Sequence, residues 1–427
     1  MIGKIETTTL ENGCRVVTAA NPAMQSVSLC FDAGIGSRHE AAGELGYSHF
    51  LEHMLFKGSE KYRSTRAVSQ PVERLGGSIN AFTSTSHTCF FAMVPYDAAN
   101  IAFDVIGDIF TRPLFPPRDI ALERRVVLEE MKMYHDDDSS YASELCQAAL
   151  WPRHPLGRPI LGTPKTLAAI DHDALVAYHR GHYTAAGTIV AAAGRVEHAR
   201  VVDFARRFSS RLSGGGAPRC IPASRAKKPV PLSFEERETQ QVQAVLAFRA
   251  FPCGDKRRSA LAVLSQMLGR GLTSRLFMSL REKRGLAYSI GTEHSLHSDC
   301  GAFQVFAGFD PARSRDALSL CAAELRRIAE TPAGRTETNR AIGGIVGAQR
   351  MGLETSASQM LWILDKTRKL GFVETPDDTI ARISAVTPED VRSVAADIFR
   401  PEGASLALVM PRGGPAKPEE LLRASSL

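Results

Sequence analysis

Several hallmarks of common protein classes are absent from this 427-residue chain. Nowhere do 18 consecutive apolar residues occur, so the sequence predicts no membrane-spanning helix. The N-terminal residues lack the apolar stretch of a signal peptide, and this favours a cytoplasmic location. The 52 basic residues are interleaved with 46 acidic ones, and the formal net charge is only +6. No basic block therefore indicates nucleic acid as a partner.

Cysteine is present without any of its usual patterns. The eight cysteines are scattered along the chain, and no two of them form a C-x-x-C pair. In a chain without an export signal we expect them to be reduced thiols, used mainly as small core residues. The composition, 44% hydrophobic and 23% charged, is that of a soluble globular protein.

The length is too great for one ordinary hydrophobic core and predicts two domains. The segment 210–231 is rich in Gly, Pro, Ser and Lys and has no apolar periodicity, which is typical of an exposed connection. We therefore expect one domain at residues 1–212, a linker at 213–231 and a second domain at 232–427.

The two halves have a similar order of expected elements. Each opens with a strand, at Ser26–Phe31 and Gln241–Phe248. Each closes with a helix capped by Asp171 or Thr387 and followed by a further strand. This pattern predicts two copies of one domain that mixes helices and strands, with each sheet covered by helices on one face.

The segment around H-x-x-E-H predicts half of a metal site. Apolar residues recur there with helical spacing, at Tyr47, Phe50, Leu51, Met54 and Leu55. At about 100° per residue, His49, Glu52 and His53 fall together on the opposite side of the helix. Two imidazoles one turn apart can bind a single ion, with the carboxylate beside a metal-bound water.

A third ligand is expected from the helix 119–133. The inward stripe of that helix is expected to contain Ile120, Val126, Val127 and Met133. Glu123 and Glu130 lie near the centre of the stripe, where carboxylates are costly unless they are paired or bind a metal. Glu130 is therefore the predicted ligand, and Glu123 is predicted to orient a ligand. Glu129 points to one side.

With these residues in view, the chain resembles the pitrilysin superfamily of metallopeptidases, whose signature is H-x-x-E-H. The likeness is closest to the short bacterial members that resemble the beta subunit of the mitochondrial processing peptidase. The spacing agrees with the family, because 76 residues, 54–129, separate His53 from Glu130. The stretches that carry the likeness are His49–Gly58, Gly76–Ser84, Glu123–Glu130, His154–Thr163 and Leu268–Tyr288.

The resemblance implies an α+β fold with two related domains, each a mostly antiparallel sheet covered by helices. It also implies a zinc-dependent endopeptidase that hydrolyses peptides or unfolded polypeptides. One zinc ion per chain is bound by His49, His53 and Glu130, and Glu52 activates the attacking water. Arg281 and Tyr288 match an arginine and a tyrosine that reach the substrate in the family. The peptide is expected to add as a strand near residues 80–84. Because the family's chamber needs four such domains, a second copy or a metal-free relative is the expected partner.

Three alternatives remain open at the level of the sequence. The chain could be a non-catalytic assembly subunit of a peptidase-like complex, although its intact metal motif weighs against this. It could be a dedicated maturation peptidase for one precursor peptide. The same ligands could also bind cobalt or manganese instead of zinc.

Overall fold

The computed structural model describes residues 2–426. The chain forms two compact units, and each unit is drawn from both halves of the sequence. The first unit contains residues 2–131, 158–221 and 350–375, and the second contains 132–157, 222–349 and 376–426. The domain boundaries at 212 and 232 stay a prediction. The expected linker is mostly exposed, and it passes from the first unit to the second after Ile221.

The elements of the first unit are β1 (Lys4–Thr9), β2 (Arg15–Ala20), β3 (Ser26–Ala33), α1 (Tyr47–Leu55), α2 (Thr65–Glu73), β4 (Ser78–Thr83), β5 (Thr88–Pro95), α3 (Ala99–Thr111), α4 (Pro117–Asp136), α6 (Pro164–Ala168), α7 (His172–His182), β6 (Thr188–Gly194), α8 (His198–Ser209) and α12 (Ser356–Leu370). The last residues of α4 belong to the second unit.

The elements of the second unit are α5 (Asp138–Leu150), β7 (Leu232–Arg237), β8 (Val242–Ala250), α9 (Arg258–Gly269), the helical turn η5 (Phe277–Glu282), β9 (Ala287–Leu296), β10 (Gly301–Phe309), α10 (Ser314–Glu330), α11 (Arg335–Gly352), α13 (Pro376–Ser384), α14 (Pro388–Ile398), β11 (Ala404–Pro411) and α15 (Pro418–Ala424). The last residues of α11 belong to the first unit.

The first unit is built on a six-stranded sheet in the order β1-β2-β6-β3-β5-β4. Every neighbouring pair is antiparallel except β2 and β6. Helices α1, α2, α3 and α8 pack on one face around a core rich in buried phenylalanine, including Phe31, Phe90 and Phe110. Strand β4 is one edge of this sheet, so one of its sides has no neighbouring strand.

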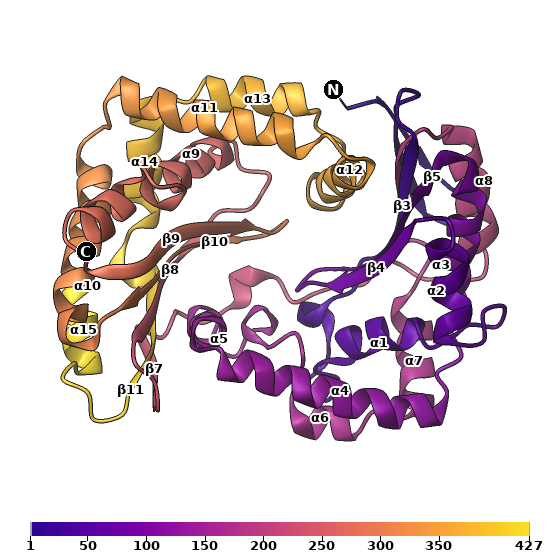
Figure 1. Ribbon diagram of the computed structural model, residues 1–427, viewed down its shortest axis with the longest axis horizontal. Helices are drawn as coiled ribbons and strands as arrows, with labels where there is room; N and C mark the ends of the chain where they lie inside the picture. The colour runs from indigo at the N-terminus through magenta and orange to yellow at the C-terminus, as the bar shows by residue number, and fades with distance from the viewer. Residues whose placement is uncertain (1, 427) are drawn as a thin grey trace. The chain divides into compact units, whose positions relative to one another are not determined.

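The other face of this sheet is covered by α12, which comes from the far end of the sequence (Figure 1). Its residues Met360, Ile363 and Leu364 are buried against β2, β3, β5 and β6. The expectation of helices on one face only was therefore wrong. Every residue of β6 is buried, as in strands that are covered on both faces.

Two polar contacts also hold α12 on the sheet. The Ser356 hydroxyl oxygen lies 2.9 Å from those of Ser26 and Ser28 on β3. At the other end of the helix, the Arg368 guanidinium donates to the fully buried carboxylate of Asp32, with its Nε 2.9 Å from Oδ2. Paired buried charges of this kind are costly to break, so α12 is an integral part of the first unit.

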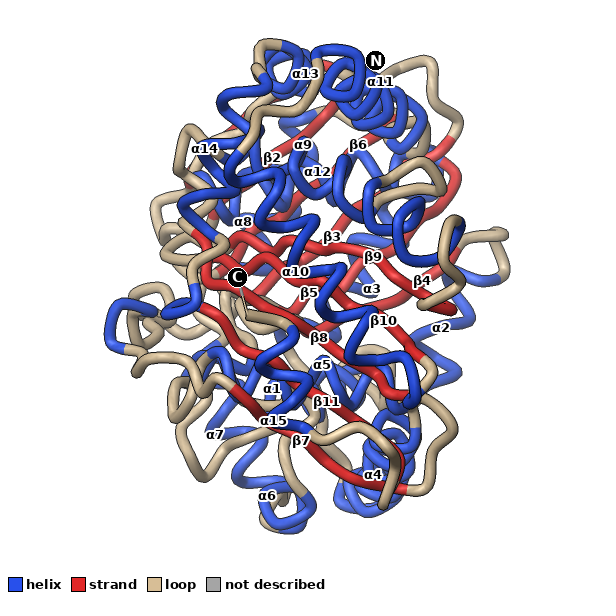
Figure 2. Tube along the Cα trace, turned by 90° about the vertical axis from the view of Figure 1, so that its left-hand side faces the viewer, coloured by secondary structure: helices blue, strands red, loops and turns tan. Residues whose placement is uncertain are grey.

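The second unit repeats this plan. Its five-stranded sheet has the order β7-β11-β8-β10-β9, and only β7 and β11 are parallel. Helices α9, α10 and α14 contribute to the core on one face, and Figure 2 shows α10 and α15 in front of the strands of this unit. Helix α5 packs on the opposite face through Ala142, Cys146 and Leu150. The two related α+β units are therefore confirmed.

Several local predictions are also confirmed. The Asp171 carboxylate accepts a hydrogen bond from the Ala174 N–H at 2.8 Å at the start of α7. Thr387 caps α14, whose first residue is Pro388. All eight cysteines are free thiols, and all except Cys220 are buried. Among the described residues, no helix has both the length and the apolar character that crossing a membrane requires.

Candidate metal centre

The helix that carries the H-x-x-E-H segment has a fixed starting point. Its N-cap, Gly46, has a φ of 87°, and a Cβ there would lie 2.5 Å from the Leu161 carbonyl oxygen. The first N–H groups of a helix lack partners within it. The buried Glu40 carboxylate accepts two such bonds, from Gly46 N at 2.9 Å and Ser48 N at 2.8 Å. Burial raises the pKa of Glu40 to about 7.

Helix α1 buries the face that its apolar spacing predicted. Its five apolar residues Tyr47, Phe50, Leu51, Met54 and Leu55 are at most 6% exposed. His49 and His53 lie one turn apart with their ring centroids separated by 4.6 Å. The two imidazoles therefore occupy one small region of the surface of α1.

Helix α4 corrects one detail of the sequence analysis. Ile120, Glu123 and Val127 are buried, but Val126 is 46% exposed and Met133 is 62% exposed. The expected stripe was wrong because, at about 100° per residue, Val126 and Met133 lie about 240° and 220° around the helix from Ile120. The buried arc contains Glu123 itself, so its carboxylate is packed between α4 and the rest of the unit.

The three predicted ligands converge. His49 Nε2 lies 3.7 Å from Glu130 Oε1, and His53 Nε2 lies 3.7 Å from Glu130 Oε2. One ligand atom from each of the three side chains lies within 4.8 Å of the others. These separations are too long for hydrogen bonds. A tetrahedral zinc ion with bonds of about 2.0–2.2 Å would place its ligand atoms roughly 3.3–3.6 Å apart, so the residues fit the ion with little movement.

A carboxylate behind the cluster orients His53. Glu123 Oε1 accepts a hydrogen bond from His53 Nδ1 at 2.9 Å, and Lys57 Nζ lies 2.5 Å from Glu123 Oε2. The proton on Nδ1 leaves the lone pair of Nε2 directed at the cluster. Burial would raise the pKa of Glu123, but the hydrogen bonds from His53 and Lys57 outweigh it and lower that pKa.

The electrostatics distinguish the two imidazoles. Burial, with a smaller effect from His53, lowers the pKa of His49 to about 3, so His49 is neutral at pH 7, as a metal ligand must be. Burial would also lower the pKa of His53. The hydrogen bond to Glu123 and the charges of Glu52, Glu123 and Glu130 outweigh burial and raise it. Protons and a divalent ion therefore compete for His53 more strongly than for His49.

Glu52 lies beside the cluster and is held by the edge strand. Its Oε2 accepts a hydrogen bond from the Thr83 hydroxyl at 2.5 Å, at the last residue of β4. Burial raises the pKa of Glu52 and outweighs the hydrogen bond from Thr83 and the charge of His53, which lower it; the charge of Glu130 adds a smaller increase. A carboxylate with a raised pKa is a better proton acceptor at neutral pH. The structure thus places a basic carboxylate at the end of a free sheet edge.

Comparison with known families agrees with this geometry. The sequence pattern of the family described as insulinase, peptidase family M16, matches residues 15–164, which contain the three clustered ligands. The pattern described as the peptidase M16 inactive domain matches residues 169–344. This chain belongs to peptidase family M16.

Bacterial relatives of this M16 chain are similar over almost their whole length. A protein of Streptomyces coelicolor, named an uncharacterized zinc protease, is 37% identical over 430 residues, covering 99% of this chain and 92% of that protein. The Bacillus subtilis protein YmxG, with the same description, is 33% identical over 408 residues, covering 95% of this chain and 98% of its own.

Two solved structures share the fold. A protease from Helicobacter pylori superimposes with a TM-score of 0.89 at 20% identity and covers 96% of this chain and 100% of its own. A peptidase M16 inactive domain from Pseudomonas fluorescens gives a TM-score of 0.89 at 18% identity and covers 97% and 100%. The two-unit architecture is therefore that of M16 proteins.

Sequence reasoning did not single out two residues that contact this M16 centre. Lys57 lies four residues after His53, but α1 ends at Leu55, so Lys57 belongs to the turn after the helix and helical spacing does not predict its position. Thr83 lies in a segment that resembles the family, but its contact with Glu52 depends on β4 lying next to α1. Only the packing of the unit shows that Lys57 contacts Glu123 and that Thr83 contacts Glu52.

Two predicted site residues lie in the second unit. Arg281 is in η5 and Tyr288 is at the start of β9, and the Arg281 guanidinium carbon lies 5.7 Å from the Tyr288 ring centroid. Tyr288 is 74% exposed. The two side chains form a cation–π pair on the surface of that unit. Their action on a substrate stays a prediction.

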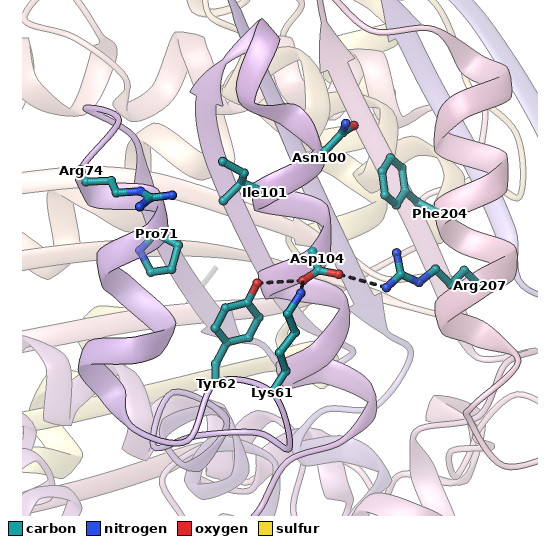
Figure 3. A pocket seen from close by; sticks show the side chains of 9 residues that line it. All are labelled: Lys61, Tyr62, Pro71, Arg74, Asn100, Ile101, Asp104, Phe204 and Arg207. Atoms are coloured by element: carbon teal, nitrogen blue, oxygen red, sulfur yellow. Dashed lines mark hydrogen bonds and ion pairs between the residues drawn. The ribbon is translucent and has the colours of Figure 1, made fainter.

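The hollow drawn in Figure 3 is not part of the metal centre. This pocket of about 540 Å³ lies between α2, α3 and α8. At its base the Asp104 carboxylate accepts from the Tyr62 hydroxyl at 2.8 Å and pairs with Lys61 and Arg207. Asp104 on α3 is thus bonded to Arg207 on α8 and to Lys61 and Tyr62 of the loop before α2, so the network ties two helices and a loop together.

Proposed function

We propose that this M16 protein is a zinc-dependent endopeptidase. The observation that supports the proposal most is the convergence of His49, His53 and Glu130, with the basic carboxylate of Glu52 beside them. The zinc-protease names of its relatives add independent support for the identity of the metal. Neutral imidazole and carboxylate are ligands that zinc accepts in catalytic sites.

The chemistry divides between the ion and the protein. Bound zinc supplies a Lewis acid that lowers the pKa of water to roughly 7 and polarises a carbonyl oxygen. Glu52 takes the proton of the attacking water and later gives it to the leaving amine. Its Oε2 is engaged by Thr83, so Oε1 is the atom that carries the proton. Glu123 keeps His53 in the tautomer that the site requires.

A peptide substrate would add to the sheet of the first unit. Strand β4 is a free edge that ends at Thr83, which contacts Glu52. An extended peptide pairing with this edge passes the carboxylate that activates water. Main-chain pairing accepts many sequences, and this favours peptides and unfolded polypeptides as substrates. We assign Arg281 and Tyr288 to substrate binding because both match the family's motif.

We further propose a paired assembly and a cytoplasmic location. The partner is a second copy or a metal-free relative, since the family's chamber uses four such units. Size-exclusion chromatography with light scattering tests for the second copy. Eight free cysteines suit a reducing compartment.

The decisive experiment combines metal content with cleavage. The purified chain, loaded with zinc, is incubated with a library of quenched peptides, and products are located by mass spectrometry. Glu52→Gln is expected to retain one zinc ion per chain and to lose roughly 10²–10⁴-fold in kcat. Glu130→Gln is expected to lose zinc. Glu129→Gln, a change of the neighbouring exposed residue, is expected to retain both properties.

Each other outcome selects an alternative. Zinc binding without cleavage, alone and with candidate partners, would favour a non-catalytic assembly subunit. Cleavage of a single precursor, with no turnover of the library, would indicate a dedicated maturation peptidase. Unchanged turnover in Glu52→Gln would remove Glu52 as the base.

A further inference from the structure

A second hollow of the first unit lies at the beginning of the free edge strand. It has a volume of about 420 Å³ and lies between the turn before β3, the end of β5 and the start of α12. Met93, which lines it, pairs directly with Ser78, the first residue of β4. The hollow therefore adjoins the end of β4 that is opposite to the Glu52 contact.

The walls of this hollow are mainly apolar and adaptable. Met24, Met93, Val94 and Pro95 line it. Methionine side chains are flexible and polarisable, so such a pocket accepts apolar groups of varied shape. The buried Ser356 hydroxyl is already hydrogen-bonded to Ser26 and Ser28. Gln25, Glu354 and Thr355 also line the hollow, but all three are exposed, so the more buried part of the lining is mainly apolar. That part favours an apolar side chain.

The path from the free edge into the hollow is open. Gly76 lines the hollow two residues before β4, and a Cβ on Gly76 would meet no atom within 4 Å. The distance along the edge follows from the strand rise of about 3.4 Å per residue. Thr83 is seven positions after Gly76, so an extended peptide needs roughly 24 Å to reach the hollow from the Glu52 end.

We propose that this hollow is a distal substrate subsite, which binds an apolar side chain of a peptide already paired with β4. The bound side chain lies about six to eight residues from the cleaved bond, because one residue of the peptide passes each residue of the edge. The inference rests on the proposed function and adds a length and sequence preference to it. Peptides that are too short to reach the hollow gain no binding affinity from it.

Binding is measured separately from cleavage. Products of the wild-type enzyme first locate the cleaved bond in a 20-residue peptide. Fluorescence anisotropy then gives the affinity of the zinc-loaded Glu52→Gln variant for that peptide. Two versions carry Leu or Asp at the positions six to eight residues from the bond, on each side in turn, and a short version ends before them. We expect the Leu peptide to bind about tenfold more tightly than the Asp and short peptides.

Two variants examine the hollow itself. Met24→Glu places a carboxylate in the wall on a half-buried turn residue, and Met93→Gln changes the wall with little change in volume. Each is expected to remove most of the advantage of the Leu peptide over the short peptide. Phe372→Glu is the matched control, because Phe372 is 59% exposed and follows the opposite end of α12. It is expected to keep the advantage.

The outcomes separate this proposal from the proposed function. Equal affinities for the Leu, Asp and short peptides on both sides of the bond would overturn the subsite, even if cleavage is efficient. An advantage of the Leu peptide that survives Met24→Glu and Met93→Gln would also overturn it. A protein that cleaves no peptide would instead count against the endopeptidase. In that case the binding assay tests the subsite alone: Leu is placed at each position of the peptide in turn. A gain in affinity that Met24→Glu and Met93→Gln remove would support the subsite, and no gain at any position would overturn it.

Discussion

At the scale of single residues, Lys57 is the contact of the metal centre with the clearest measurable consequence. Its ammonium group lies 2.5 Å from the Glu123 carboxylate, which in turn orients His53. Lys57→Met leaves Glu123 buried with one partner fewer, so His53 is held less firmly. We expect the affinity for zinc to fall about tenfold, as on loss of other groups that orient a ligand.

Competition with a fluorescent chelator measures this affinity without any need for peptidase activity. Lys57→Arg keeps the positive charge, and we expect it to bind zinc nearly as tightly as the wild type. If Lys57→Met and the wild type bind zinc equally, Lys57 serves only to balance charge. A loss of zinc affinity in both variants would show that the shape of the lysine side chain, and not its charge, supports the site.

Part of the candidate site was predictable because one helix carries most of the information. The shared face of His49, Glu52 and His53 follows from the period of α1 alone. Glu123 and Glu130 were singled out because carboxylates are costly on an inward face, although part of the apolar stripe expected beside them is exposed. The hydroxyl of Thr83 was not predictable in this way, because serine and threonine are common on strand ends and a single sequence does not show which helix lies beside them.

At the scale of elements, the start of α1 gives a prediction about pH. The folded-state pKa of Glu40 is about 7, above the ordinary value of 4.5, because the carboxyl is buried. The folded state therefore favours the protonated form. Its contribution to stability is complete below about pH 4.5 and is lost as the pH rises through 7. On the order of 3 kcal/mol is at stake over this range.

Urea unfolding of the wild type and Glu40→Gln at several pH values measures the effect. We expect the free energy of unfolding of the variant, relative to the wild type, to increase between pH 4.5 and 7.5. Glu11→Gln changes an exposed carboxyl elsewhere in the first unit and is expected to leave the pH dependence as it is. A constant difference between Glu40→Gln and the wild type would mean that the two backbone hydrogen bonds keep Glu40 ionised.

The elements themselves differ in how far the sequence predicts them. Caps such as Asp171 and Thr387 mark the helix starts because they satisfy N–H groups locally. The buried face of α4 was less predictable. Val126 and Met133 are apolar yet exposed, while Glu123 is charged and buried, so polarity alone did not show which face packs inward. The buried face of such a helix becomes clear only when the partners of its charged residues are known, as with Glu123, His53 and Lys57.

At the scale of the whole molecule, the exchange of helices between the sequence halves has the largest consequence. The first unit uses α12 from residues 350–375, and the second uses α5 from residues 132–157. Neither exchange follows from local patterns, because the apolar stripe of α12 is equally compatible with the sheet of its own half. We therefore expect that the two parts on either side of residues 213–231 do not fold alone.

A split protein tests this argument. Residues 1–221 expressed alone lack α12, so the apolar face formed by Val17, Cys30 and Ile189 is exposed to water. We expect that fragment to aggregate or to lack a cooperative unfolding transition. Coexpression with residues 222–427 supplies α12 to the first unit and α5 to the second. We expect the two fragments to copurify in equal amounts and to unfold together.

The helix itself provides the matched pair of variants for the split protein. Ile363→Asp puts a charge on the fully buried side of α12. Because burying an unpaired charge is costly, we expect the two fragments of this variant not to copurify. Lys369→Asp changes a 39%-exposed side chain of the same helix and is expected to leave the fragments associated. A fragment 1–221 that is monomeric and unfolds cooperatively would show that α12 is dispensable. Copurification that survives Ile363→Asp would show that other contacts hold the fragments together.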